Sequence, residues 1–418
     1  MLKAAKVCVA VTGLSIALLG LLIGVLYFVL SLVYGKGETD PLQISILGTA
    51  FVALGLGLGL PLGWQGLRSL LGYPSRPFRP RLMGLLALFV LAVVVGQIIL
   101  VTDFFVPLIF PPFHGLGAAL PPLIVIAFVN RRLRSAAIPV RWREVVLLTG
   151  SGAFLAIFLA FGLEAAFGLF ALFAVLLAAA LTPNGMAWLQ QLTANLQDPL
   201  WIADPVNLSQ VLLSPPIAVA LVLIFAVIAP LGEEFFKPLG VALMSYRRPE
   251  AARAFLWGVA GGAGFAIVEG LFNAAIALES WGVVVLLRVG STLMHCLGSG
   301  LMGLGWYHLL KTRRPWHILG TYAASVGLHI LWNVGAMGMA AVSLGAMASG
   351  ADEVSLALSG LGLLVLGAYL TLLTLVMAFA IYYLAGRRRQ KQLSPSSALR
   401  DQNNVSDHPR DKTSWRIS

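Results

Sequence analysis

Residues 82–102, LMGLLALFVLAVVVGQIILVT, form an apolar run without a single charged side chain. About twenty apolar residues are the length at which a helix crosses the hydrocarbon core of a bilayer. Nine further runs of this kind are spread over the 418 residues, and only 11% of all residues are charged. Soluble domains carry about 25% charged residues, so the chain has no room for a large soluble domain. We therefore expect an all-α, polytopic transmembrane helical bundle.

The number of membrane crossings depends on two long runs. The ten apolar runs are 7–34, 45–67, 82–102, 106–129, 145–182, 211–246, 254–278, 281–309, 316–342 and 355–386. As a straight helix, 145–182 would be about 57 Å long, which is long for one crossing and just enough for two, with a turn at 162–164. If 145–182 and 211–246 each cross once, the chain has about ten spans, and if each crosses twice it has twelve. We favour ten.

The net charge of +11 follows a pattern along the chain. Basic residues gather at the N-terminus, after every second span and in the tail, whereas the intervening loops are acidic or bare. This is the positive-inside pattern, and it predicts that both termini are cytoplasmic in a multi-pass protein of a bacterial-type plasma membrane. It also accounts for the positive charge without a nucleic-acid partner. The bilayer itself is the first expected partner.

Composition divides the chain into five regions. They are an N-terminal four-helix transmembrane region (1–144), a transmembrane segment plus interfacial loop (145–210), a core that holds the polar residues (211–345), a last transmembrane helix (346–386) and a disordered basic cytoplasmic tail (387–418). Within the loop at 183–210, Trp188, Leu189, Leu192 and Leu196 recur at helical spacing, which favours a short helix lying in the membrane interface.

Charged and strongly polar residues inside the apolar runs are costly, so they mark functional sites. They are Glu233, Glu234 and Lys237 in one run, Glu269 in the next, Arg288 and His295 in a third, and His329 with Asn333 in a fourth. At 1.5 Å per residue, each of the four runs places a Glu or His about 18–22 Å from its cytoplasmic end. Four segments thus deliver acidic or imidazole groups to one depth, and we predict that these groups form one cluster.

Helical spacing adds supporting residues to this cluster. Side chains four positions apart share a helix face. Lys237 can therefore pair with Glu233, Asn273 lies one turn beyond Glu269, and Asn333 lies beside His329. Arg288 shares a face with His295, two turns away.

Two chemistries suit such a cluster. A buried Glu can act as a general base that deprotonates water for attack on an amide carbonyl, while His or Asn holds the developing oxyanion. Alternatively, His295, His329 and Glu269 are a suitable zinc set with a further Glu as base, although no compact His-Glu-x-x-His motif is present. A proton-coupled transporter or channel is another interpretation, because intramembrane Glu and His also build proton relays. A relay would spread its groups along the membrane normal, whereas these share one level.

The order of these elements resembles one known family. Glu233-Glu234-x-x-Lys237, Phe265-x-x-x-Glu269, Arg288 with His295, and His329-x-x-x-Asn333 follow one another on successive runs over roughly 215–345. This series resembles the PrsW family of intramembrane proteases, distant relatives of the CAAX prenyl-proteases and bacteriocin-processing proteins. The resemblance implies hydrolysis of a peptide bond in a membrane-associated protein, such as an anti-sigma factor in regulated proteolysis.

The resemblance also implies roles for single residues. Glu233 and Glu234 would supply the base, and Glu269, His295 and His329 would complete the site. Both a metal-dependent and a glutamic mechanism are compatible with it. A protease-like scaffold that binds partners without cutting is a further alternative, which the intact set of Glu and His disfavours.

Overall fold

The computed structural model describes residues 3–33, 41–133, 140–245, 249–273, 278–348 and 353–393. Its helices are α1 (Lys3–Val33), α2 (Pro41–Val52), η1 (Ala53–Gly59), α3 (Leu60–Leu70), α4 (Leu82–Thr102), α5 (Val106–Leu133), α6 (Trp142–Gly150), η2 (Ser151–Ala156), α7 (Ile157–Ala180), α8 (Pro183–Asn195), α9 (Pro199–Ala203), α10 (Pro205–Leu213), α11 (Pro215–Val222), η3 (Leu223–Ile228), α12 (Ala229–Phe236), α13 (Leu239–Met244), α14 (Ala251–Asn273), η5 (Leu278–Ser280), α15 (Trp281–Thr312), α16 (Pro315–Ala348) and α17 (Glu353–Leu393). The described residues contain no β-strand. The all-α prediction is confirmed.

Ten helices within the described ranges are long and apolar enough to cross a membrane, which confirms the count of ten. One of them runs from Trp142 to Ala180 without a break. The turn considered at 162–164 does not form. A glycine inside a helix costs only about 1 kcal/mol, whereas a turn in hydrocarbon would expose backbone N–H and C=O groups that only a helix can satisfy there.

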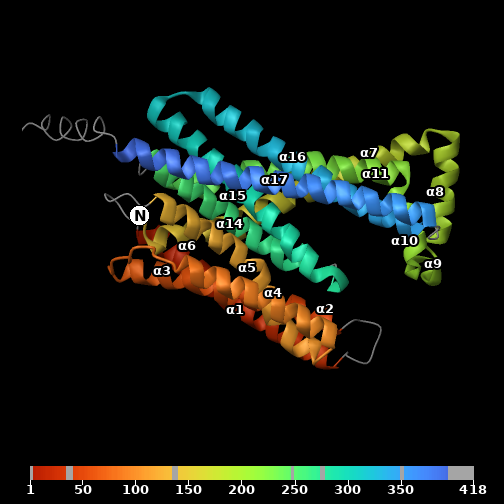
Figure 1. Ribbon diagram of the computed structural model, residues 1–418, viewed down its shortest axis with the longest axis horizontal. Helices are drawn as coiled ribbons and strands as arrows, with labels where there is room; N and C mark the ends of the chain where they lie inside the picture. The colour runs from red at the N-terminus through yellow and green to blue at the C-terminus, as the bar shows by residue number, and fades with distance from the viewer. Residues whose placement is uncertain are drawn as a thin grey trace, which may run out of the picture.

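The spans lie side by side, and both ends of the described chain are at the left end of the bundle in Figure 1. An even number of crossings requires this arrangement. At the opposite end, α8 lies across the long axes of the spans (Figure 1). The helix expected around Trp188 and Leu192 is thus present, and it has the orientation of a helix at a membrane surface.

The rest of 183–210, which we expected to be a loop, also contains short helices. α8, α9 and α10 each begin with a proline. The preceding Thr182, Asp198 and Asp204 each accept a hydrogen bond from a backbone N–H of the first turn. Proline at the first helical position and an oxygen-bearing side chain before it favour helix initiation, which explains why this polar segment is helical.

The core of the bundle surrounds α14, the most deeply buried of the spans. α14 packs against α15, α5, α6 and η2. Gly258 and Gly262 let α15 approach closely, because a Cβ atom at either position would collide with the α15 backbone at Ser299 or His295. This contact fixes the depth of His295 relative to α14.

At the end of the chain, α17 continues to Leu393, several residues beyond the expected end of the last span at 386. The first part of the predicted tail is therefore helical. The remainder of that tail, 394–418, lies outside the described residues.

Candidate active site

The two adjacent glutamates lie on α12, whose start is set by Pro230. The preceding segment η3 is a π-helix, in which each N–H bonds to the carbonyl five residues earlier. Pro230 has no N–H, so the carbonyl of Phe225 lacks that donor. Asn333 Nδ2 supplies a donor instead, 2.8 Å from the Phe225 oxygen. Asn333 therefore ties the helix that carries the glutamates to α16.

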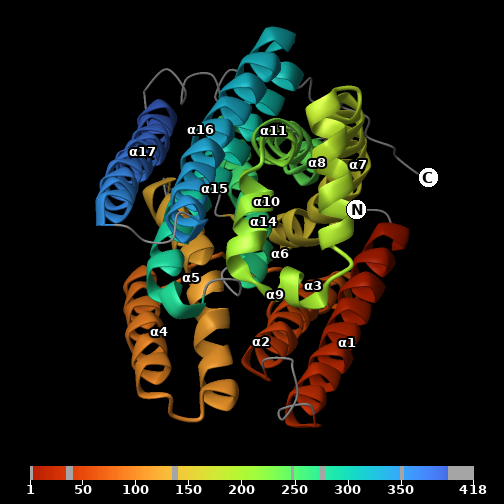
Figure 2. The same ribbon diagram turned by 90° about the vertical axis from the view of Figure 1, so that its right-hand side faces the viewer.

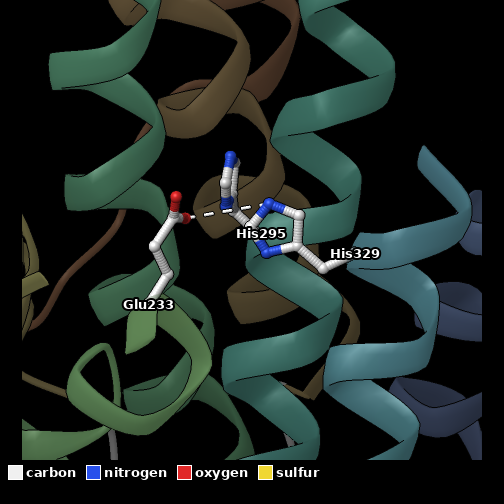
Figure 3. Close-up of side chains that lie close together, drawn as sticks. All are labelled: Glu233, His295 and His329. Carbon is white, nitrogen blue, oxygen red and sulfur yellow. Dashed lines mark ion pairs between the residues drawn. The ribbon is translucent and has the colours of Figure 1, made fainter. Parts of the chain in front are cut away.

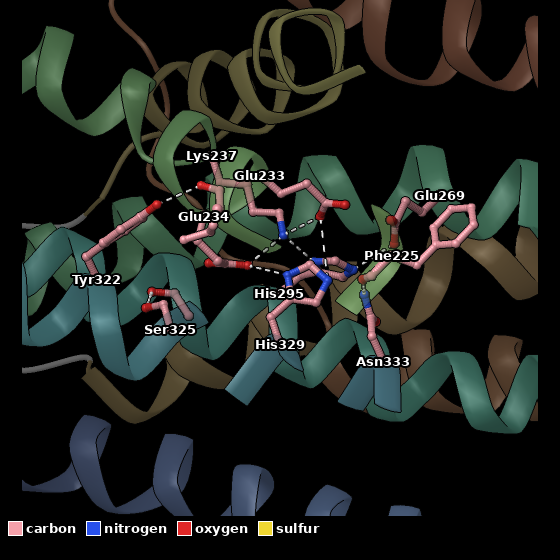
Figure 4. A network of polar contacts seen from close by, with 12 residues as sticks. Phe225, Glu233, Glu234, Lys237, Glu269, His295, Tyr322, Ser325, His329 and Asn333 are labelled. Carbon is pink, nitrogen blue, oxygen red and sulfur yellow. Dashed lines mark hydrogen bonds and ion pairs between the residues drawn. The ribbon is translucent and has the colours of Figure 1, made fainter. Parts of the chain in front are cut away.

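Lys237, at the end of α12, lies at the centre of the polar cluster (Figure 4). Its ammonium nitrogen is 2.8 Å from Glu233 Oε2, 2.7 Å from Glu234 Oε1 and 2.7 Å from His295 Nδ1. It also lies 4.3 Å from the centre of the Phe265 ring. An ammonium group has three N–H donors, and here each of them has an acceptor. Pro238 follows directly and ends this turn of helix.

Each histidine is held by a carboxylate on one ring nitrogen. His329 Nδ1 lies 3.0 Å from Glu234 Oε1, and His295 Nε2 lies 2.7 Å from Glu269 Oε2. A carboxylate accepts, so these nitrogens donate, and the other nitrogen of each ring is left as an electron-pair donor. His295 Nδ1 then accepts from Lys237, and His329 Nε2 faces Glu233 Oε2 at 3.8 Å.

Three of these side chains converge on one point (Figure 3). Glu233, His295 and His329 each offer a ligand atom, and the three atoms lie within 4.8 Å of one another. Two imidazoles and a carboxylate are ligands that zinc accepts in catalytic sites, and histidine ligands in such sites usually donate their other N–H to a carboxylate. The residues therefore fit a divalent metal. The sequence suggested Glu269 as the carboxylate of this set, whereas the geometry brings in Glu233 and places Glu269 behind His295.

Arg288 completes the cluster from the side of Glu269. Its guanidinium Nη2 is 2.9 Å from Glu269 Oε2. The side chains of Glu269 and Arg288 are 21% and 17% exposed, whereas those of Glu233, Glu234 and Lys237 are 7% exposed or less. The cluster is thus open on the Glu269 side and closed elsewhere.

The structure thus brings together all the residues that the sequence singled out, with one exception. Asn273, one turn beyond Glu269, is exposed at the end of α14, outside the polar cluster.

Glu164 is a residue of the site that the sequence analysis missed. It lies on α7 and interacts electrostatically with Glu233, Glu269 and Lys237. A single acidic residue in the middle of an apolar run was the available signal, but Glu164 could also be interpreted as part of a turn at 162–164. Glu164 adds a fourth carboxylate to the three that surround Lys237 and Arg288. A cluster with more carboxylates than cationic side chains suits a divalent cation.

Comparison with known protein families agrees with this geometry. The model of the PrsW family intramembrane metalloproteases matches residues 140–365, more than half of the chain. The chain belongs to this family. It is an intramembrane peptidase and a multi-pass membrane protein. No curated protein and no solved structure matches it.

The PrsW match is wider than the resemblance found in the sequence. It begins before α6 and therefore includes α7, which carries Glu164, and it ends within α17. α1 to α5 lie outside it.

Proposed function

We propose that this PrsW-family peptidase is a metal-dependent hydrolase whose metal is held by Glu233, His295 and His329. The observation that carries the proposal is the pairing of each imidazole with a carboxylate, which leaves one nitrogen of each ring directed at the shared point. A divalent metal bound there, zinc being the best match to the donors, would polarise the substrate carbonyl and acidify a bound water.

Glu234 is the proposed general base. Its Oε1 is held by Lys237 and His329, whereas its Oε2 is buried and has no hydrogen-bond partner among the described residues. Because Glu234 is hydrogen-bonded to His329, a proposed ligand, its carboxylate lies beside the metal point, where it would take a proton from water as the water oxygen adds to the carbonyl carbon. The same proton then passes to the amide nitrogen as the carbon–nitrogen bond breaks.

The remaining polar residues position these groups. Glu269 orients His295, and Arg288 holds Glu269 in place. Asn333 anchors the helix before the two glutamates, and Lys237 balances their charge while no metal is bound. Such support matters because ligands must be held in place for metal affinity and reactivity.

The proposed substrate is a membrane-associated protein or peptide that reaches the site from the open side at Glu269 and Arg288. In the orientation that the positive-inside pattern favours, with both termini in the cytoplasm of a bacterial-type cell, this site lies within the plasma membrane. Cleavage there suits regulated proteolysis of a membrane-anchored regulator such as an anti-sigma factor.

Two single-atom changes test the assignment. Purified Glu234→Gln should retain bound metal and lose roughly 10²–10⁴-fold in cleavage rate, the usual contribution of a general base. Glu233→Gln should lose bound metal as well as activity, because an amide oxygen is a weaker ligand than a carboxylate. Metal content is measured by elemental analysis, and cleavage by mass spectrometry of membrane proteins from matched cells.

Asn273→Ala is a suitable control, because Asn273 lies outside the cluster. If Glu233→Gln retained its metal, the ligand assignment would be wrong. If Glu234→Gln cleaved as well as the unchanged protein, Glu234 would not be the base.

A further inference from the structure

An apolar cavity lies away from the active site, between α1 and a wall formed by α6, η2, α7 and α13. Its volume is about 1100 Å³. α1, which forms one side of it, lies at the edge of the molecule (Figure 2). Its lining runs from Ala5 to Ile16 along α1 and from Leu147 to Phe158 along the facing wall. No residue of the Glu–His–Lys cluster lines it.

The depth of the cavity matches one leaflet of a bilayer. From Ala5 to Ile16, and equally from Leu147 to Phe158, eleven helical steps span about 16 Å. Half of a hydrocarbon core is about 15 Å. The end of the cavity at Ala5 and Leu147, called the shallow end, lies within two turns of the start of α1 and of α6. The cavity therefore spans the leaflet on the basic side of the bundle.

The length of the cavity favours a lipid over a transmembrane helix. A spanning helix would need a groove through both leaflets. Flexible acyl chains end at the bilayer midplane, so they match a cavity that is one leaflet deep.

Basic residues lie near the end of the cavity at Ala5 and Leu147. Lys6 follows Ala5 on α1, and Arg141 directly precedes α6. Arg143 lies one turn before Leu147 on the same face of α6, and its guanidinium also donates to the Tyr73 carbonyl oxygen at 2.9 Å. The one acidic residue in the first turn of α6, Glu144, is buried in an ion pair with Arg253. The mouth of the cavity is therefore positive, and basic residues at this level attract anionic headgroups.

From depth and charge together, we propose that this cavity binds an anionic phospholipid of the basic-side leaflet. The acyl chains lie between α1 and α7, and the phosphate lies at the level of Lys6 and Arg143. Gly240 and Met244 place α13 in the wall of the cavity, and α13 begins two residues after Lys237. The lipid therefore supports the same turn of helix that carries the ammonium group of the active site.

The native cysteines provide the test. Cys8 lines the cavity and is exposed, whereas Cys296, the second of the two cysteines in the chain, is buried. The full-length protein in mild detergent is treated with an apolar maleimide, and alkylation is followed by mass spectrometry. Phosphatidylglycerol should slow alkylation of Cys8 several-fold and saturably, and phosphatidylcholine should do so far less.

A matched variant separates this site from general lipid contact. In a Cys8→Ser background, Leu18→Cys places the thiol on an exposed position of α1 that does not line the cavity, and it should show no saturable protection. Leu155→Trp, which fills the cavity from a partly exposed position, should abolish protection of Cys8, whereas Leu169→Trp on the lipid-facing side of α7 should not.

Three results would overturn the proposal. The first is equal protection of the thiols at positions 8 and 18, and the second is equal protection of Cys8 by both lipids. The third is protection of Cys8 by a single-span peptide but not by phospholipid, which would make the cavity a helix-docking site. Since the alkylation of Cys8 is measured in the unchanged protein, a variant that fails to fold does not decide the outcome.

Discussion

Replacing Lys237 by methionine removes the ammonium group and keeps an unbranched side chain of similar length. In the structure this nitrogen is fully buried and lies 2.7–2.8 Å from Glu233, Glu234 and His295. Two of these partners, Glu233 and His295, are also proposed metal ligands. Lys237 therefore competes with a bound cation for the same donor atoms, and its loss should have opposite effects on stability without metal and on metal affinity.

The magnitude follows from the cost of an uncompensated buried charge. Removing one partner of a buried ion pair costs about 3–5 kcal/mol, and the lost contact with the Phe265 ring adds up to about 2 kcal/mol. Without metal, Lys237→Met should therefore unfold at a clearly lower temperature. A divalent cation relieves most of this cost, and at 1.4 kcal/mol per tenfold, 3–5 kcal/mol corresponds to an affinity gain of about 10²–10³-fold or more.

The assay is a titration of metal-depleted protein with Zn²⁺ or Co²⁺ against a competing chelator, together with thermal unfolding at each metal concentration. Arg253→Met is the matched control, since it breaks the Glu144–Arg253 ion pair of 3.0 Å outside the site. The control should be destabilised equally with and without metal. If Lys237→Met bound metal no more tightly than the unchanged protein, the ammonium and the metal would not share their ligands, and the reasoning would fail.

Two further substitutions test the supports of the cluster. In Gly298→Ala, the added Cβ would lie 2.7 Å from Glu234 Oε2. Overpacking of this kind costs about 1–3 kcal/mol, so we expect a lower unfolding temperature and a lower cleavage rate. Gly327→Ala, with open space around it, should behave as the unchanged protein. In Asn333→Ala, the Phe225 carbonyl loses its donor at a cost of about 1–3 kcal/mol, and metal titration should show weaker binding because the glutamate helix is no longer anchored.

Much of the fold could be predicted from the sequence because the bilayer leaves few alternatives. Backbone groups in hydrocarbon must be satisfied within the chain, so a run of twenty apolar residues is a helix. The same rule explains why the alternative with a turn at 162–164 fails, since the membrane does not tolerate a turn there. The depths of the polar residues could be calculated for a related reason, since each residue of a straight helix adds a fixed rise along its axis.

The pairing of side chains could not be predicted in this way. Depth places Glu233 and Glu269 at the same level, and only the packing of α14 against α15 decides which carboxylate meets which nitrogen of His295. The π-helix before Pro230 is also invisible to hydrophobic periodicity. A π-helix shifts the register of the following residues by one position, so helical periodicity alone does not predict which way Glu233 and Glu234 face.

The N-terminal spans, which lie outside the family match, also contribute to the site. Trp281 Nε1 donates to His114 Nδ1 at 3.2 Å, so the proton of this neutral ring must lie on Nε2, 2.9 Å from the carbonyl oxygen of Leu271. That carbonyl is among the last four of α14, which have no partner within the helix. His114 on α5 thus caps the end of α14 two residues beyond Glu269 and joins it to the start of α15. We therefore infer that α5 holds Glu269 against His295 and that the N-terminal region is part of the catalytic scaffold.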